Sequence, residues 1–129
     1  MITDLAVKSV QISDGTGMIP TATLVFATPS GEEKVSCASQ GEENIHHAIF
    51  RAIREVVISC APDLDNGQEI ILLACGANLP YRGGCKAHAH IRISSNGDGR
   101  NCKRNGKHPT NSHMAVARAM LNCFRDLTA

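Results

Sequence analysis

Apolar and polar residues alternate over several short stretches of the chain, which is the pattern of strands that bury one face. The clearest stretches are residues 22–26 (ATLVF) and 89–93 (AHIRI). Each is followed by turn-forming residues, PSG at 29–31 and NGDG at 96–99, and then by a second short strand. The remaining predicted strands are residues 5–12, 33–38, 69–76 and 100–104.

Two segments instead have the 3.6-residue period of an amphipathic helix, at about residues 45–58 and 112–127. Asn44 is a suitable N-cap for the first helix, and Thr110 or Asn111 for the second. The apolar stripe of the first helix consists of Ile45, Ile49, Ala52, Ile53, Val56 and Val57. The stripe of the second consists of Met114, Ala117, Leu121 and Phe124.

The two halves of the chain repeat one another at an offset of about 67 residues. Ala48, Arg51, Ala52 and Ile53 correspond to Ala115, Arg118, Ala119 and Met120. Each half follows the order β-β-β-α and has a glycine, Gly41 or Gly106, in a predicted loop before its helix. This order indicates an internal duplication, although an unrelated arrangement of hairpin and helix would give the same pattern.

The predicted fold class is therefore α+β, with mainly antiparallel sheets and helices packed on one face. One lobe spans about residues 1–60 and the other about 68–129, joined by the turn-rich linker 61–67. With about 60 residues each, the lobes have marginal cores on their own. We expect them to pack together as a single domain, residues 1–129, and to leave surface for a second chain.

Three stretches resemble the C-terminal regulatory (allosteric, dimerisation) domain of 2-isopropylmalate synthases and related citramalate synthases. They are GTGMIPTATL at 15–24, the Gly41 loop with AIFRAI at 48–53, and GKHPTN at 106–111 with AVARA at 115–119. The resemblance extends from about Leu5 to Leu127. It implies a cytoplasmic homodimer that binds a branched-chain amino acid, usually leucine, for feedback inhibition in leucine biosynthesis.

The parent enzymes of this family are transferases that use acetyl-CoA, and their catalytic barrel is a separate region. The resemblance therefore implies no catalysis, no cofactor and no metal site in this chain alone. A partner barrel domain is possible, because the chain could be an excised domain or a stand-alone relative. The first loop departs from the family's Gly-x-Gly-Pro-Val/Ile-Asp-Ala pattern: it is one residue longer, and His47 replaces the acidic residue. A dimerisation module that binds no effector is therefore the alternative.

The expected effector site lies at the two helix N-termini, where backbone N–H groups and the helix dipole favour a carboxylate. A branched aliphatic side chain would then contact the first turns of both helices. The candidate residues are Gly41, Asn44, Ile45, His47, Ala48, Ile49, Gly106, Asn111, Met114 and Ala115. Both glycines could equally serve only as tight turns.

Charge divides unevenly between the halves. Residues 1–80 carry four basic and ten acidic side chains, whereas residues 81–129 carry nine basic and two acidic ones. This asymmetry suits either an anion bound by the second half or pairing of unlike halves in a dimer. Aromatic residues make up only 3% of the chain, so we do not expect a nucleic-acid stacking platform. We also expect no membrane span and no signal peptide.

A double-stranded RNA-binding domain is an alternative of another class. Its basic residues would be Arg100, Lys103, Arg104, Lys107 and His108, near the start of the second helix. Such a domain needs a helix before its strands, and none is predicted directly before His88. The lysine-rich start of its second helix is also missing.

The cysteines and histidines complete the candidate chemistry. The six cysteines lack CxxC spacing, so we expect reduced and mostly buried thiols. His88 and His90 have the spacing of two metal ligands on one strand face, but no carboxylate lies close in the sequence, so we expect no metal site. No nucleophile with an activating base is visible, and we expect no catalytic residue.

Overall fold

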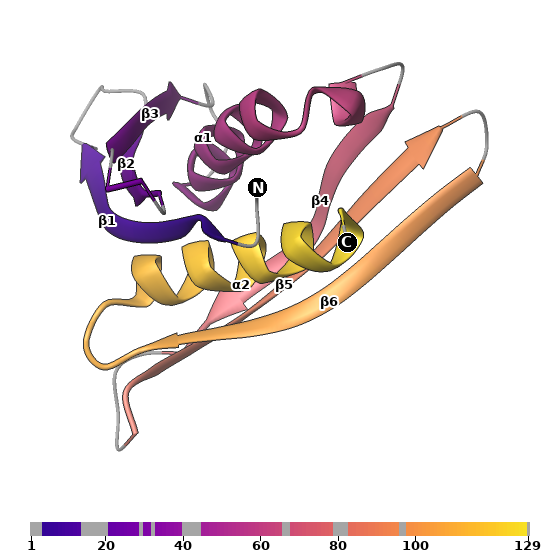
Figure 1. Cartoon of the computed structure of the whole chain (residues 1–129). Helices are drawn as coiled ribbons and strands as arrows, with labels where there is room; N and C mark the ends of the chain where they lie inside the picture. Colours follow the sequence, from indigo (N-terminus) through magenta and orange to yellow (C-terminus); the bar gives the residue numbers. More distant parts are fainter. Residues whose placement is uncertain are drawn as a thin grey trace.

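The computed structural model describes residues 4–13, 21–28, 30–31, 33–39, 45–65, 68–78, 83–95 and 98–128. Its elements follow the predicted order β-β-β-α twice (Figure 1). They are β1 (Ala6–Ser13), β2 (Thr21–Ala27), β3 (Glu33–Ser39), α1 (Ile45–Cys60), the 3-10 helix η2 (Pro62–Asp65), β4 (Glu69–Ala77), β5 (Cys85–Ser95), β6 (Asp98–His108) and α2 (Ser112–Leu127). The α+β prediction is confirmed, and the bounds of the second helix agree at both ends.

The strands form two antiparallel sheets in the order β1-β2-β3 and β4-β5-β6. The first predicted turn is present: Gly31 has a φ of 84°, and its N–H donates to the Thr28 carbonyl at 3.0 Å. The second turn is shorter than predicted. Asp98 pairs with Ser95, so residues 98 and 99 belong to β6, and only residues 96 and 97, outside the described residues, lie between the strands.

The two helices form a layer between the two sheets (Figure 1). Helix α1 packs on β2 and β3, α2 packs on β5 and β6, and the helices also contact each other. Helix α2 contacts β1 as well. One face of each sheet is therefore covered by a helix, and neither helix covers the other face.

The position of α2 between the two sheets explains why more of its residues are buried than the four of its predicted apolar stripe. Met114, Ala117, Leu121 and Phe124 are buried as expected. Six further residues of α2 are buried too: Ala115, Val116, Ala119, Met120, Cys123 and Leu127. A helix between two sheets has little surface left for solvent, so small and apolar residues occupy almost every side of it.

The buried apolar side chains of both repeats belong to one cluster, which runs from Leu5 to Leu127. Within it the rings of Phe50 in α1 and Phe124 in α2 stack against each other. Because a lobe of about 60 residues has only a marginal core of its own, the two repeats share one.

Candidate functional site

The N-termini of the two helices lie close together. His46 is the second residue of α1 and His113 the second residue of α2. The pKa of His46 is lowered from its ordinary value of 6.5, mainly by burial and then by the charges of His113 and His47. The fold therefore brings together the first turns of the two helices, where several of the candidate effector-binding residues lie.

The electrostatics of this region favour an anion. Neither α1 nor α2 has an acidic residue in its first turn. The positive ends of both helix dipoles converge there with three imidazoles. A carboxylate would be stabilised at these N-termini, whereas an ammonium group would find no acidic partner among the described residues of the first turns.

The candidate residues differ in their accessibility. Ala48, Ile49 and Ala115 are 0% exposed, and Met114 is buried as well. Three others, Ile45, His47 and Asn111, are half-buried and can contact a ligand at the helix N-termini. Gly41 and Asn44 lie outside the described residues.

Asn111 has the predicted role of N-cap for α2. Its Oδ1 accepts a hydrogen bond from the Met114 N–H at 3.0 Å. His108 supports the same turn, because its Nδ1 accepts from the N–H groups of Thr110 and Asn111. Two side chains thus satisfy backbone donors at the start of α2.

The sequence predicts Gly106 in a loop before the second helix, but Gly106 lies within β6. A Cβ atom at this position would lie 2.4 Å from both the Ala115 carbonyl oxygen and the Ala119 nitrogen. Glycine is required here because β6 and α2 approach each other so closely. The predicted turn at Gly106 is therefore wrong, although a glycine is needed at this position for another reason, its packing against α2.

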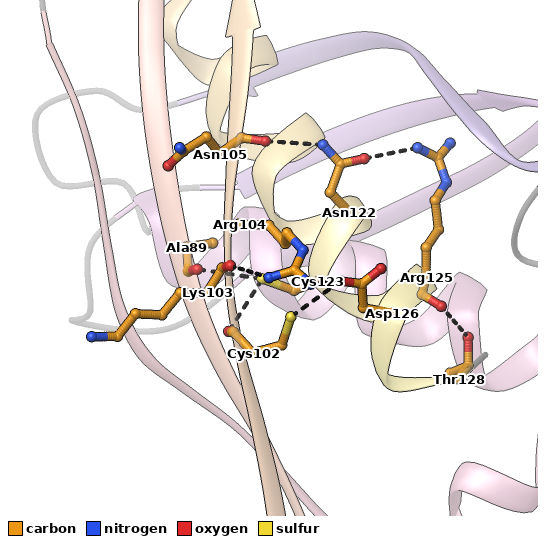
Figure 2. Close-up of polar contacts among 10 residues, drawn as sticks. All are labelled: Ala89, Cys102, Lys103, Arg104, Asn105, Asn122, Cys123, Arg125, Asp126 and Thr128. Carbon is orange, nitrogen blue, oxygen red and sulfur yellow. Dashed lines mark hydrogen bonds and ion pairs between the residues drawn. The ribbon is translucent and has the colours of Figure 1, made fainter.

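Side chains cap the backbone of β6, an edge strand of its sheet (Figure 2). Three of its carbonyl oxygens accept hydrogen bonds: Lys103 from Arg104 at 2.7 Å, Asn105 from Asn122 at 2.9 Å, and Lys107 from Arg118 at 2.8 Å. These bonds occupy groups that a further strand would need for pairing. The edge is therefore closed to strand addition at these positions.

Two cysteines lie in the same seam between β6 and α2 (Figure 2). Cys123 donates to the carbonyls of Ala89 and Cys102, at 3.3 and 3.4 Å, and Cys102 donates to Asp126 at 3.6 Å. Burial, more than any charge, raises the pKa of the Cys123 thiol to about 12, and burial also raises the pKa of Cys102. These thiols are structural and poorly nucleophilic.

The other described cysteines are reduced as well. Cys85 is buried, and Cys60 and Cys75 are half-buried thiols. Burial raises the pKa of Cys75. The side chain of Cys37 lies outside the described part of the chain.

His88 and His90 share the outer face of β5, as their spacing predicts, because the residues that alternate with them are buried. The His88 ring lies over Gly76 of the neighbouring strand, 3.0 Å from where a Cβ would stand. In the part of the chain that the structure describes, no group of three His, Cys, Asp or Glu side chains is placed to hold a metal ion.

The basic residues of the RNA-binding alternative do not form one surface. Arg104 pairs with Asp126, and Arg100 donates to the Leu127 carbonyl at 2.7 Å, both toward α2. Lys103 instead lies opposite His90, on the outer face of the sheet. Helix α1 does precede β4, but both helices lie between the sheets (Figure 1).

A scan against protein-family models finds no match, and no curated protein matches the sequence. None of the helices among the described residues is long and apolar enough to cross a membrane.

Proposed function

We propose that this chain is a cytoplasmic regulatory and dimerisation domain that binds a branched-chain amino acid, with leucine as the first candidate, where its two helix N-termini meet. The observation that carries the proposal is the closeness of these N-termini, indicated by the contact between the helices and by the effect of His113 on His46. A duplicated β-β-β-α unit that brings two helix N-termini together offers two dipoles to one carboxylate.

The aliphatic part of the effector needs an apolar contact beside this carboxylate site. Ile45 supplies it, because it is half-buried in the first turn of α1 and packs against the core. Burial of an isobutyl group contributes about 1.5–3 kcal/mol, and a carboxylate at a helix N-terminus about 0.3–2 kcal/mol. Such contributions suit a metabolite sensor of micromolar to millimolar affinity.

Homodimerisation is the second part of the proposal. Each sheet has a face that neither helix covers, and large apolar side chains remain exposed: Val35 of β3 at 65% and Leu73 of β4 at 46%. A second copy would remove such side chains from water. The acidic first half and the basic second half also allow unlike surfaces to meet.

Light scattering and calorimetry test the two parts separately. We expect a dimer at tens of micromolar, and saturable heat with leucine, isoleucine or valine but not with lysine. Ile45→Ala should weaken binding roughly tenfold. Ile58→Ala is the matched control, because Ile58 is a half-buried residue near the opposite end of α1.

The two parts can fail independently. A well-folded dimer that gives no heat with any branched-chain amino acid would leave a dimerisation module only. A monomer at this concentration would contradict dimerisation. The proposal assigns no acyl transfer to this chain, so acetyl-CoA-dependent condensation by the purified protein would overturn it.

A further inference from the structure

A second region of the molecule also has the character of a ligand site. A hollow of about 390 Å³ lies between the middle of α2, the edge of β6 and the start of β1. This volume falls within the range of small-molecule sites, about 300–1,000 Å³. The side chains that shape it come from α2 and β1: Ala6, Val7, Arg118, Leu121, Asn122 and Arg125.

Two guanidinium groups line this hollow, Arg118 and Arg125 of α2. None of the described residues that line it is acidic. Asp126, the acidic residue of α2, pairs instead with Arg104. The positive charge in the hollow is therefore not neutralised by its own walls, which favours an anionic ligand.

Strand β6 contributes mainly backbone to the hollow. Gly106 has no side chain. Lys107 lies opposite the exposed Lys86 in the register of β5 and β6, on the outer face of the sheet. The carbonyl of Lys107 accepts from Arg118. The positive charge of the hollow is therefore assigned to the two arginines of α2.

Both guanidinium groups are held in place by hydrogen bonds. Arg118 donates to the Lys107 carbonyl at 2.8 Å. Arg125 donates to the Leu5 carbonyl and, at 2.9 Å, to Oδ1 of Asn122 (Figure 2). Because these contacts restrain the side chains before any ligand arrives, binding costs little side-chain entropy.

Donor capacity remains after these contacts. A guanidinium has five N–H groups, and the contacts above use one in Arg118 and two in Arg125. The Nε–H of Arg125 has no acceptor among the described residues either, but it is buried, so the donors within reach of a ligand are the terminal N–H groups. The contacts described above therefore leave several of these donors for the oxygens of an anion.

The rest of the wall is apolar. Val7 and Leu121 are buried core residues that reach this surface, and Ala6 lies beside them. A short aliphatic group could pack there while a charged group faces the two arginines. An ammonium group would be repelled by the same arginines, so the walls discriminate against a zwitterion.

We propose that the hollow between α2, β6 and β1 binds a small organic anion that carries a carboxylate or a phosphate and no ammonium group. The anionic oxygens lie between Arg118 and Arg125, and a short aliphatic portion contacts Val7 and Leu121. The hollow takes its α2 residues from Arg118 to Arg125, whereas the proposed effector site uses the start of the helix at residues 111–115. The two sites are therefore distinct.

Calorimetry on the full chain at low ionic strength tests this proposal with two probes, inorganic phosphate and 4-methylpentanoate. The first probe carries the phosphate chemistry and the second the aliphatic carboxylate, and the substitutions described below assign any binding to the hollow. We expect saturable binding of at least one probe at millimolar concentration. Leucine, which adds an ammonium group to the carbon skeleton of 4-methylpentanoate, should bind this hollow at least about tenfold more weakly.

Two substitutions of different kinds locate the site. Arg118→Gln removes a charge but keeps a donor for the Lys107 carbonyl, and it should weaken binding about tenfold. Ala6→Glu adds a negative charge at an exposed residue of the hollow and removes no contact, so it should weaken binding at least as much. Arg51→Gln is the matched control, because Arg51 is the exposed arginine of α1 at the position that repeats Arg118.

Three results would overturn the proposal: no saturable binding of either probe, equal weakening by Arg51→Gln and Arg118→Gln, or unchanged binding in both Arg118→Gln and Ala6→Glu. The outcome is separable from that of the effector site. Leucine binding at the helix N-termini should respond to Ile45→Ala and not to Ala6→Glu, whereas anion binding in the hollow should respond in the opposite way.

Discussion

The rings of Phe50 and Phe124 stack with their centroids 6.0 Å apart and their planes inclined by 16°. Phe50 belongs to the helix of the first repeat and Phe124 to the helix of the second. Both are buried in the cluster that the two repeats share. This contact joins the two repeats directly, so a substitution that loosens the packing of one repeat also destabilises the other.

Phe50→Leu and Phe124→Leu should each lower the free energy of unfolding by about 1–2 kcal/mol. The double variant should lose less than the sum, by roughly 0.5–1.5 kcal/mol, because the stacking contribution can be lost only once. Urea denaturation followed by circular dichroism measures all four proteins. Strictly additive losses, or separate transitions for the two halves, would contradict a single cooperative core.

Gly106→Ala should be severely destabilising, by about 3 kcal/mol or more. The added Cβ would meet backbone atoms of Ala115 and Ala119 at 2.4 Å. Backbone inside a helix cannot move aside as a side chain can, so β6 and α2 would have to separate. Thermal and urea denaturation of the variant provide the measurement.

Gly76→Ala is the matched control for this substitution. Its Cβ would meet only the ring of His88, with the nearest atom at 3.0 Å. The exposed imidazole can rotate away, so we expect a change below about 1 kcal/mol. Similar losses in both variants would mean that the close approach of β6 to α2 is not what requires glycine at position 106.

The sequence predicted the elements well because its local signals agreed with the final packing. Alternation marked β2 and the centre of β5, and the N-cap Asn111 marked the start of α2. The extent of β6 was missed because its sequence, DGRNCKRNGKH, is polar. Cys102 is the only buried residue of this strand, so an edge strand that packs through a glycine leaves no apolar pattern to detect.

The candidate site was predictable only in part. The duplication identified the two helix N-termini as equivalent, and the fold brings His46 and His113 near each other. Burial of Ala48 within a single chain could not be foreseen, because periodicity gives the face of a helix and not the number of layers around it. The hollow lined by Arg118 and Arg125 depends on β1 lying against α2, a contact between residues more than 100 positions apart.

His46 should make stability depend on pH. Burial lowers its pKa below 6.5 in the folded protein, while the unfolded chain keeps the ordinary value. The unfolded state therefore binds more protons in this range, and the free energy of unfolding should fall as the pH drops below about 6.5. Urea denaturation at pH 7.5 and pH 5 should show a smaller loss for His46→Gln than for the native protein.

His88→Gln provides the comparison, because His88 is an exposed histidine on the face of β5 turned away from α2. The comparison separates the loss of an exposed imidazole from the loss of a buried one. If the free energy of unfolding of both variants depended on pH with the same slope as that of the native protein, burial of His46 would not contribute to the pH dependence.

The alkylation rates of the cysteines should differ according to how far each thiol is buried. At pH 8 the native protein should resist alkylation at Cys102 and Cys123, since burial raises both pKa values and that of Cys123 to about 12. The partly exposed Cys60 should react at least roughly a hundredfold faster than Cys123. Mass spectrometry of peptides after timed iodoacetamide treatment gives the rates, and denaturation in urea should abolish the difference. Equal native rates at Cys60 and Cys123 would show that the seam between β6 and α2 opens readily.

His47→Asp tests the chemistry of the proposed effector site by adding an acidic group to the first turn of α1. The first turns of both helices have no acidic residue, and the resemblance places an acidic residue where this chain has His47. An aspartate there would accept a hydrogen bond from the ammonium group of an amino acid, and its charge would also favour the helix N-terminus. We therefore expect His47→Asp to strengthen leucine binding about tenfold.

Two comparisons decide whether this gain comes from the ammonium group. Binding of 4-methylpentanoate, which lacks that group, should not be strengthened by His47→Asp, because a new carboxylate adds no attraction for an anion, whether the compound binds in the hollow or beside position 47. His47→Asn matches the shape of the aspartate without its charge and should give a much smaller gain for leucine. Calorimetry with both compounds on all three proteins measures these differences. An equal gain for the two compounds, or none for leucine, would mean that the ammonium group does not lie beside position 47.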